Sequence, residues 1–314
     1  MRTGILLTAT GLLLAACALM AMARNEAAYR PRGRVEDDPP AFYSADLFKR
    51  MPPPKPGDWR AAHPEQEQSF AAYTRATAVR PTEDRHMLVV AQVGPMNEAQ
   101  GKQLAVLAEF LGLFYVLPGR QGPPLGLEGV TGRDRTILGR EMRQYHTGDI
   151  LRKVLAPALP GNAVCLQGVT MEDLYPDPSW NYVFGEASLA GRVGIYSLVR
   201  FQPAFWGEAD AEAGRRLAFL RSLKTLVHET GHMFGLHHCQ TYECVINGSN
   251  SLTESDARPI HLCPVCLKKL RWNLGFDVVE RYEALRAFYT KHGMTDQAAW
   301  VAKRLAQCRE GKAK

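Results

Sequence analysis

Residues 228–239 read HETGHMFGLHHC, and this stretch decides how the fold and chemistry of the chain are interpreted. On an α-helix, residues four apart lie one turn above each other, so His228 and His232 direct their imidazole rings at the same point. Glu229 lies beside them on that face, close enough to contact a water without binding the metal itself. The pattern therefore predicts a metal-binding helix with an acidic side chain beside the metal.

The third histidine of the motif lies beyond the helix. A straight helix would carry His238 about three turns away from His228, so the chain must turn back. Gly235 is the residue that can adopt the left-handed backbone needed to end the helix and reverse direction. Three neutral imidazoles with an open fourth position describe a catalytic zinc site rather than a closed structural one. The competing interpretation is a helix whose histidines are ordinary surface or core residues.

A second metal signature follows directly. Four of the seven cysteines fall in two close pairs, Cys239 with Cys244 and Cys263 with Cys266. Four thiolates in such pairs suit a closed tetrahedral zinc site, which would be structural and would help to orient His238. The alternative is that the four cysteines form two disulfides, which would be favoured if the chain is exported to an oxidising compartment. The two-residue separation within CPVC favours chelation over a strained local disulfide.

Composition limits the remaining possibilities. The chain has 314 residues, 46% of them hydrophobic and 22% charged, which is enough to bury a sizeable core in one or two domains. The net charge of +6 is modest and spread along the chain, so we expect no nucleic-acid partner.

The first 23 residues have the pattern of an export signal. A charged start, Met1-Arg2, precedes an apolar run from Ile5 to Ala23. Within it, LAAC at residues 14–17 resembles the lipobox of bacterial lipoproteins, in which Cys17 is acylated after cleavage before it. Cleavage after Ala23 and a retained anchor are the alternatives. In all three cases the rest of the chain lies outside the cytoplasmic membrane, so we expect a cell-envelope protein, anchored through a lipid on Cys17.

Residues 24–57 are rich in proline and mixed charge and end near Met51-Pro52-Pro53-Pro54. No helical or strand period persists, so we expect a tether between the membrane and the catalytic domain. An extended arm packed on the domain is the alternative.

The catalytic domain is expected to span residues 58–308, followed by a disordered tail at 309–314, with Cys308 a free thiol beside it. Apolar runs predict strands at 87–93, 113–117, 163–168, 181–187 and 192–199, the third containing Cys165 as a core residue. One of the last two is a candidate edge strand beside the cleft. Helical periodicity predicts helices at 67–75, 98–111, 148–155, 211–234, 278–292 and 295–307. The predicted class is α/β (α+β), with a mixed sheet and a long active-site helix.

The combined string HExxHxxGxxHCx4C followed by CxxC resembles the archaemetzincins, a branch of the metzincin zinc peptidases. Four further segments resemble that family: PGDW (56–59), VTMEDLYP (169–176), WNYVFGEAS (180–188) and RPIHLCPVC (258–266). The resemblance covers about residues 58–307. It implies a compact metzincin-like fold, a catalytic zinc on His228, His232 and His238, Glu229 as the base, and a second, structural zinc on Cys239, Cys244, Cys263 and Cys266.

One position departs from the family pattern. Archaemetzincins usually have methionine two residues after the second cysteine, where it forms a turn beneath the catalytic metal, and this chain has Ile246. Isoleucine is apolar and of similar volume, so we expect the floor of the site to pack.

The sequence thus predicts a monomeric zinc-dependent peptidase that hydrolyses peptides or proteins, using two Zn²⁺ ions. Zinc activates a water and polarises the scissile carbonyl, while Glu229 accepts the water proton and passes it to the leaving amine. The alternative is a non-catalytic binding protein on a retained peptidase fold, although Glu229 has no purpose in a purely structural site. Aminopeptidase and endopeptidase action both remain open.

Overall fold

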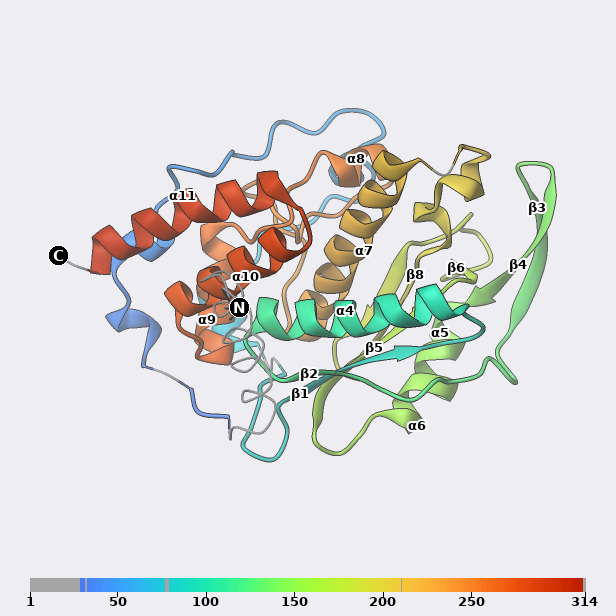
Figure 1. Cartoon of the computed structure of the whole chain (residues 1–314), viewed down its shortest axis with the longest axis horizontal. Coiled ribbons are helices and arrows are strands. Elements are labelled where there is room, and N and C mark those ends of the chain that lie inside the picture. The colour runs from blue at the N-terminus through green and yellow to red at the C-terminus, as the bar shows by residue number, and fades with distance from the viewer. Residues whose placement is uncertain (1–28, 32, 77–78, 210, 313–314) are drawn as a thin grey trace, which may run out of the picture.

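A five-stranded sheet lies at the centre of the computed structural model, which describes residues 29–31, 33–76, 79–209 and 211–312 (Figure 1). Its strand order is β2-β1-β5-β8-β7, and all neighbours are parallel except β7 and β8. The strands are β1 (Met87–Gln92), β2 (Gly119–Gln121), β5 (Ala163–Thr170), β7 (Gly185–Ser188) and β8 (Val193–Ser197). Every residue of β5 is buried, as expected for a parallel strand covered on both faces.

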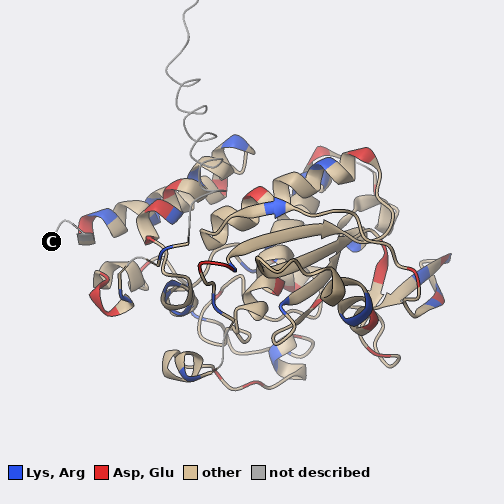
Figure 2. Ribbon diagram, turned by 90° about the horizontal axis from the view of Figure 1, so that it is seen from below, with Lys and Arg blue, Asp and Glu red and all other residues tan. Residues whose placement is uncertain are grey.

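Helices cover both faces of this sheet. On one face lie α4 (Glu98–Tyr115) and the long α7 (Glu212–Met233), with α9 (Pro264–Leu274), α10 (Val278–Lys291) and α11 (Thr295–Lys312) packed against them in the larger core. A smaller core on the other face includes the π-helical turn η3 (Ile150–Leu155), which follows α5 (Thr147–Asp149) and precedes α6 (Ala156–Ala158). Figure 2 shows the sheet almost free of charge, whereas acidic and basic residues alternate along the helices.

A second sheet contains three strands in the order β3-β4-β6, namely β3 (Gly132–Ile137), β4 (Arg140–His146) and β6 (Asp173–Tyr175). The antiparallel β3–β4 hairpin projects from the body of the molecule (Figure 1). The sequence prediction missed it because its strands, GRDRTI and REMRQYH, contain no apolar run. The remaining short helices are α2 (Trp59–Ala62), α3 (Phe70–Arg75), η4 (Val199–Phe201), η5 (Pro203–Trp206) and α8 (Leu252–Asp256).

The strand predicted at residues 113–117 is wrong. Helix α4 continues through Tyr115 and ends at Val116, whose backbone is left-handed with φ 56°, and the neighbouring strand is β2. Phe110, Phe114 and Tyr115 are all buried in the larger core. A short apolar run fits a buried strand and a buried helix end equally well, and here length and packing favour the helix.

The predicted tether is wrong for residues 35–50, where the structure shows the packed arm instead. This segment contains η1 (Val35–Asp37) and η2 (Pro40–Tyr43), and it runs alongside α11 (Figure 1). Phe42 and Phe48 are buried in the larger core, and Asp38 forms an ion pair with Arg271 at 3.0 Å. Burial of two aromatic side chains outweighs the freedom that the proline-rich composition suggested.

The predicted tail from residue 309 is also wrong as far as residue 312, because α11 extends to Lys312 and buries Cys308. The proposed export signal, residues 1–23 with Cys17, lies outside the described residues. Within the described part of the chain, no helix combines the length and apolar character needed to cross a bilayer.

Candidate active site and metal centres

Helix α7 brings His228 and His232 together near its C-terminal end. Their Nε2 atoms lie 3.0 Å apart, as expected for positions one turn apart on one helix face. Leu223, Leu226 and Val227 anchor the opposite face of α7 in the core. The helix ends at Met233, and Gly235 adopts the left-handed backbone with φ 83° that the sequence predicted.

The turn after α7 returns His238 to the other two histidines. Its ring centroid lies 5.4 Å from that of His228 and 4.8 Å from that of His232. One ring nitrogen of each histidine lies within 4.8 Å of those of the others. The structure therefore gathers the three residues that the motif singled out.

Each histidine has its Nδ1 atom bound to an acceptor. Nδ1 of His228 lies 2.9 Å from the carbonyl oxygen of Val245, and Nδ1 of His232 lies 2.6 Å from that of Leu236. Nδ1 of His238 lies 2.8 Å from the Glu65 carboxylate. When Nδ1 carries the proton and donates it to these acceptors, the Nε2 lone pair is left for a metal. The donor set thus fits zinc, which takes neutral imidazole nitrogen.

Burial also keeps two of these imidazoles neutral. It lowers the pKa of His228 well below its usual value, with a further contribution from the neighbouring His232 and His238. Burial, followed by the charge of His238, lowers the pKa of His232 to about 4. Both rings are therefore unprotonated at neutral pH, as a metal ligand must be.

Glu229 is 7% exposed and lines the same cavity as the three histidines. Burial first, and then the charge of Glu186, raises the pKa of Glu229 to about 8. Gly185 on β7 lies directly against it, since a Cβ atom at Gly185 would lie 2.8 Å from Glu229 Oε1. The carboxylate is therefore confined between α7 and the edge strand β7.

Several side chains around the histidines were not found from the sequence. Glu65 accepts a hydrogen bond from Trp59 Nε1 at 2.9 Å as well as its contact with His238. The Trp59 ring stands edge-on to His238 at 5.0 Å. Glu186 lines the cavity beside Glu229. Glu65 and Trp59 lie more than 170 positions before His238, so no local spacing could reveal the contact, although PGDW was among the segments that resemble the family.

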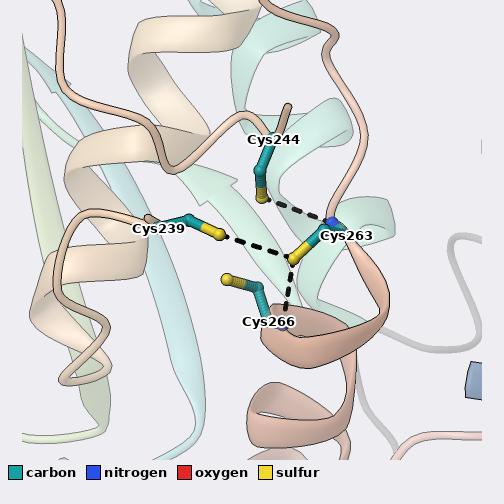
Figure 3. A group of neighbouring side chains, drawn as sticks. All are labelled: Cys239, Cys244, Cys263 and Cys266. Atoms are coloured by element: carbon teal, nitrogen blue, oxygen red, sulfur yellow. Dashed lines mark hydrogen bonds between the residues drawn. The ribbon is translucent and has the colours of Figure 1, made fainter. Parts of the chain in front are cut away.

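The four cysteines meet between the turn that carries His238 and the start of α9 (Figure 3). Their sulfur atoms all lie within 4.8 Å of one another. Cys239 Sγ and Cys263 Sγ are 3.6 Å apart, well beyond the roughly 2.05 Å of a disulfide bond, and all four cysteines are free. The Sγ atoms of Cys244 and Cys263 accept hydrogen bonds from backbone N–H groups at 3.3 and 3.4 Å. The donor set fits a tetrahedral zinc site rather than two disulfides.

Ile246 occupies the floor of the site, as expected. It is fully buried, and its carbonyl oxygen accepts a hydrogen bond from the Cys239 N–H at 2.9 Å. A Cβ atom at Gly231 of α7 would lie 2.7 Å from Ile246 Cδ1, so the side chain packs directly beneath the metal-binding helix.

A cavity of about 930 Å³ opens over the histidines and Glu229. Its walls come from the edge strand β7, the segment before it, the start of α2, helix α7 and the region around α8. Gly185, Glu186 and Ala187 of β7 line it, which confirms the predicted edge strand beside the cleft. The cavity is large enough for several residues of a peptide.

Comparison with known proteins agrees with this site. The model of peptidase family M54 matches residues 140–272. Archaemetzincin-2 of Macaca fascicularis is 35% identical over 269 residues, which cover 77% of this chain and 74% of the relative. Archaemetzincin-2 of Homo sapiens is also 35% identical over 269 residues with the same coverage. The crystal structure of archaemetzincin from Methanopyrus kandleri is 26% identical, with a TM-score of 0.46, and covers 62% of this chain and 99% of its own.

The histidine and cysteine clusters, the match to the family model and the likeness to archaemetzincin-2 define a zinc metallopeptidase. The chain belongs to the archaemetzincin family, peptidase family M54. The substrates of such an enzyme are peptides or proteins.

Proposed function

We propose that His228, His232 and His238 hold a catalytic zinc through their Nε2 atoms, and that Glu229 is the general base for hydrolysis of a peptide bond. The observation that carries this proposal is the convergence of three ring nitrogens whose partner nitrogens are already bound to oxygen acceptors. Glu229 lines the same cavity as these rings.

Zinc, when bound, supplies Lewis-acid chemistry: it lowers the pKa of water from about 16 to about 7 and polarises a carbonyl. Glu229 in its ionised form, which a nearby cation favours, accepts a proton from the attacking water and transfers it to the nitrogen of the leaving amine. Gly185 leaves the space in which the Glu229 carboxylate is held. The free edge of β7 offers backbone N–H and C=O groups to an extended substrate, which would add as a further strand.

The second half of the proposal is a structural zinc on Cys239, Cys244, Cys263 and Cys266, giving two ions per chain. The close approach of the four sulfurs supports it. Such a site ties the turn that carries His238 to the start of α9, and so restricts the position of the third histidine.

We also propose that the chain is exported as a monomer and anchored by a lipid on Cys17. The support is the charged start, the apolar run from Ile5 to Ala23 and the lipobox within it. Intact mass of the mature protein tests this directly. A chain that still begins at Met1 and fractionates with the cytosol would refute it.

The Glu229→Gln variant tests the catalytic assignment. We expect it to keep its zinc and to lose peptidase activity by about 10²–10⁴-fold, because the base is removed while the histidines remain. A mixture of fluorogenic peptides, with and without chelator, gives the activity, and elemental analysis gives the zinc content. The matched control is Glu83→Gln, which changes an exposed carboxylate. Full activity of Glu229→Gln would overturn the assignment.

A further inference from the structure

Lys224 is a buried cation in the wall of the cleft. It lies on α7 one turn before His228, about 6 Å along the helix axis. It is only 5% exposed, yet it lines the same cavity as His228 and Glu229. Lysine is almost never buried to this extent without a partner of opposite charge.

The charges around Lys224 do not balance. The Arg221 guanidinium binds both carboxylate oxygens of Asp256, at 2.9 and 2.6 Å. Arg258, a second cation in the cavity wall, lies 3.6 Å from Glu254. Three cationic side chains thus share two carboxylates, and among the described residues no carboxylate forms an ion pair with Lys224.

The Glu254 carboxylate has further hydrogen-bond partners. Glu254 accepts hydrogen bonds from the backbone N–H of Trp59 at 3.1 Å and of Asn250 at 2.8 Å, in addition to its ion pair with Arg258. The Lys224 ammonium donates one hydrogen bond to the carbonyl oxygen of Ser255. An ammonium group has three donors, so further donors remain for a ligand.

The protonation state of Lys224 suits an anionic ligand. Burial lowers its pKa to about 8, with Asp256 acting in the opposite direction. The side chain is therefore still mostly charged at pH 7. A charged hydrogen-bond donor in a partly water-excluded wall binds a carboxylate more strongly than a neutral donor does.

We propose that Lys224, with Arg258 beside it, forms a carboxylate-binding subsite of the cleft. It selects peptides that carry an acidic side chain, or their free C-terminal carboxylate, close to the bond that is cut. The inference rests on the proposed peptidase function and adds a substrate class to it. Two uncharged polar residues, Asn247 and Ser249, also line the cavity.

Paired peptides test the subsite. The probes are pairs of fluorogenic peptides with no other charged side chain, which differ at one position: one peptide has aspartate there and the other has asparagine. This position is moved in turn to each site around the cut bond, and mass spectrometry maps the cut. A second pair compares a free C-terminal carboxylate with an amide, which separates the two sources of the carboxylate. We expect the wild-type enzyme to favour a carboxylate at one position by about tenfold or more in kcat/KM.

Substitution of Lys224 then tests whether this residue causes the preference for the acidic peptide. Lys224→Gln keeps a donor for the Ser255 carbonyl but removes the charge, so the ratio of kcat/KM for the acidic peptide to that for the neutral peptide should fall to about one. Lys224→Arg should keep the preference. Lys291→Gln, at a half-exposed lysine on α10, is the matched control and should leave it unchanged. Equal cleavage of both peptides by the wild type, or a preference that survives in Lys224→Gln, would overturn the subsite.

Failure of the subsite can be distinguished from failure of the peptidase proposal. The zinc-loaded Glu229→Gln variant is titrated with the same peptide pairs, and binding is followed by fluorescence anisotropy. Tighter binding of the acidic peptide supports the subsite even if no peptide is cleaved by the wild type, which would refute only the peptidase proposal. Equal binding of both peptides, together with cleavage, would refute only the subsite.

Discussion

The Glu65 carboxylate lies 2.8 Å from Nδ1 of His238, joining a residue of the N-terminal segment to the third histidine of the motif. Burial alone would raise the pKa of Glu65, but hydrogen bonds from His238 and Trp59 outweigh it and lower the pKa. Glu65 is therefore an anion beside the histidine, where it fixes the ring orientation and, in the proposed zinc site, would strengthen Nε2 as a ligand. His228 and His232 have carbonyl oxygens in the same role.

Glu65→Gln should weaken zinc binding by about 10–100-fold, because the amide holds the His238 ring without the negative charge. Competition with a chromophoric chelator measures the affinity independently of activity. Glu83→Gln serves as the control, since it removes an exposed carboxylate distant in sequence from any of the metal-binding motifs. An unchanged zinc affinity in Glu65→Gln would show that the contact does not support the ligand.

Gly185→Ala should lower kcat by at least about tenfold while zinc is retained. The new Cβ would lie 2.8 Å from Glu229 Oε1 and 2.9 Å from the Ile195 carbonyl oxygen, so the Glu229 carboxylate must move. Steady-state kinetics together with zinc analysis measures the effect. Gly161→Ala is the matched control, because its Cβ would meet no atom within 4 Å. Normal kcat in Gly185→Ala would mean that the position of Glu229 is not critical.

Cys263→Ser should remove about one zinc per chain and lower the melting temperature, because the oxygen ligand breaks up the four-sulfur cluster. Elemental analysis and thermal unfolding provide the two readings. Cys308→Ala is the control, since Cys308 is buried in α11 away from the cluster. Two zinc ions per chain in Cys263→Ser would contradict the assignment of this cysteine.

The lowered pKa of Asp149 predicts how the free energy of unfolding changes at acid pH. This buried carboxylate accepts hydrogen bonds from Lys153, Thr131 and Arg152, which together lower its pKa well below the usual value. Because the folded-state pKa lies below that of the unfolded chain, its contribution is complete above about pH 4 and is lost as the pH falls further. Asp149→Asn should reduce the free energy of unfolding at pH 7 by about 1.5–3 kcal/mol.

Denaturant titrations at pH 7 and near pH 3 test this. The difference between wild type and Asp149→Asn should shrink at the lower pH, where the wild-type carboxylate begins to lose its advantage. Asp84→Asn, at an exposed position, should behave as the wild type. A constant difference at both pH values would show that charge on Asp149 is not what stabilises this helix start.

The clustering of the three histidines was predictable because their spacing is local. One helical turn separates His228 from His232, and a single glycine reverses the chain before His238, so the geometry is contained in eleven residues. The strand at 113–117 was mispredicted because Phe114 and Tyr115 are buried on a helix, where an apolar run has the same composition as a strand.

Contacts between residues far apart in the chain could not be predicted from the sequence. Glu65 reaches His238, and the arm around Phe42 packs on α11, only because the chain folds back on itself over more than a hundred residues. Proline-rich composition indicated a free tether, whereas the buried aromatic side chains decided the outcome. Gly185 gave no signal of its own, since its role depends on the position of Glu229 across the cleft.

Anomalous diffraction at the zinc absorption edge, from crystals of the full metal-loaded enzyme, tests the central claim most directly. The account predicts one peak within bonding distance of the Nε2 atoms of His228, His232 and His238, and a second among the four cysteine sulfurs. A first site that lacks any one of the three histidines, or that has no density at all, would contradict the account.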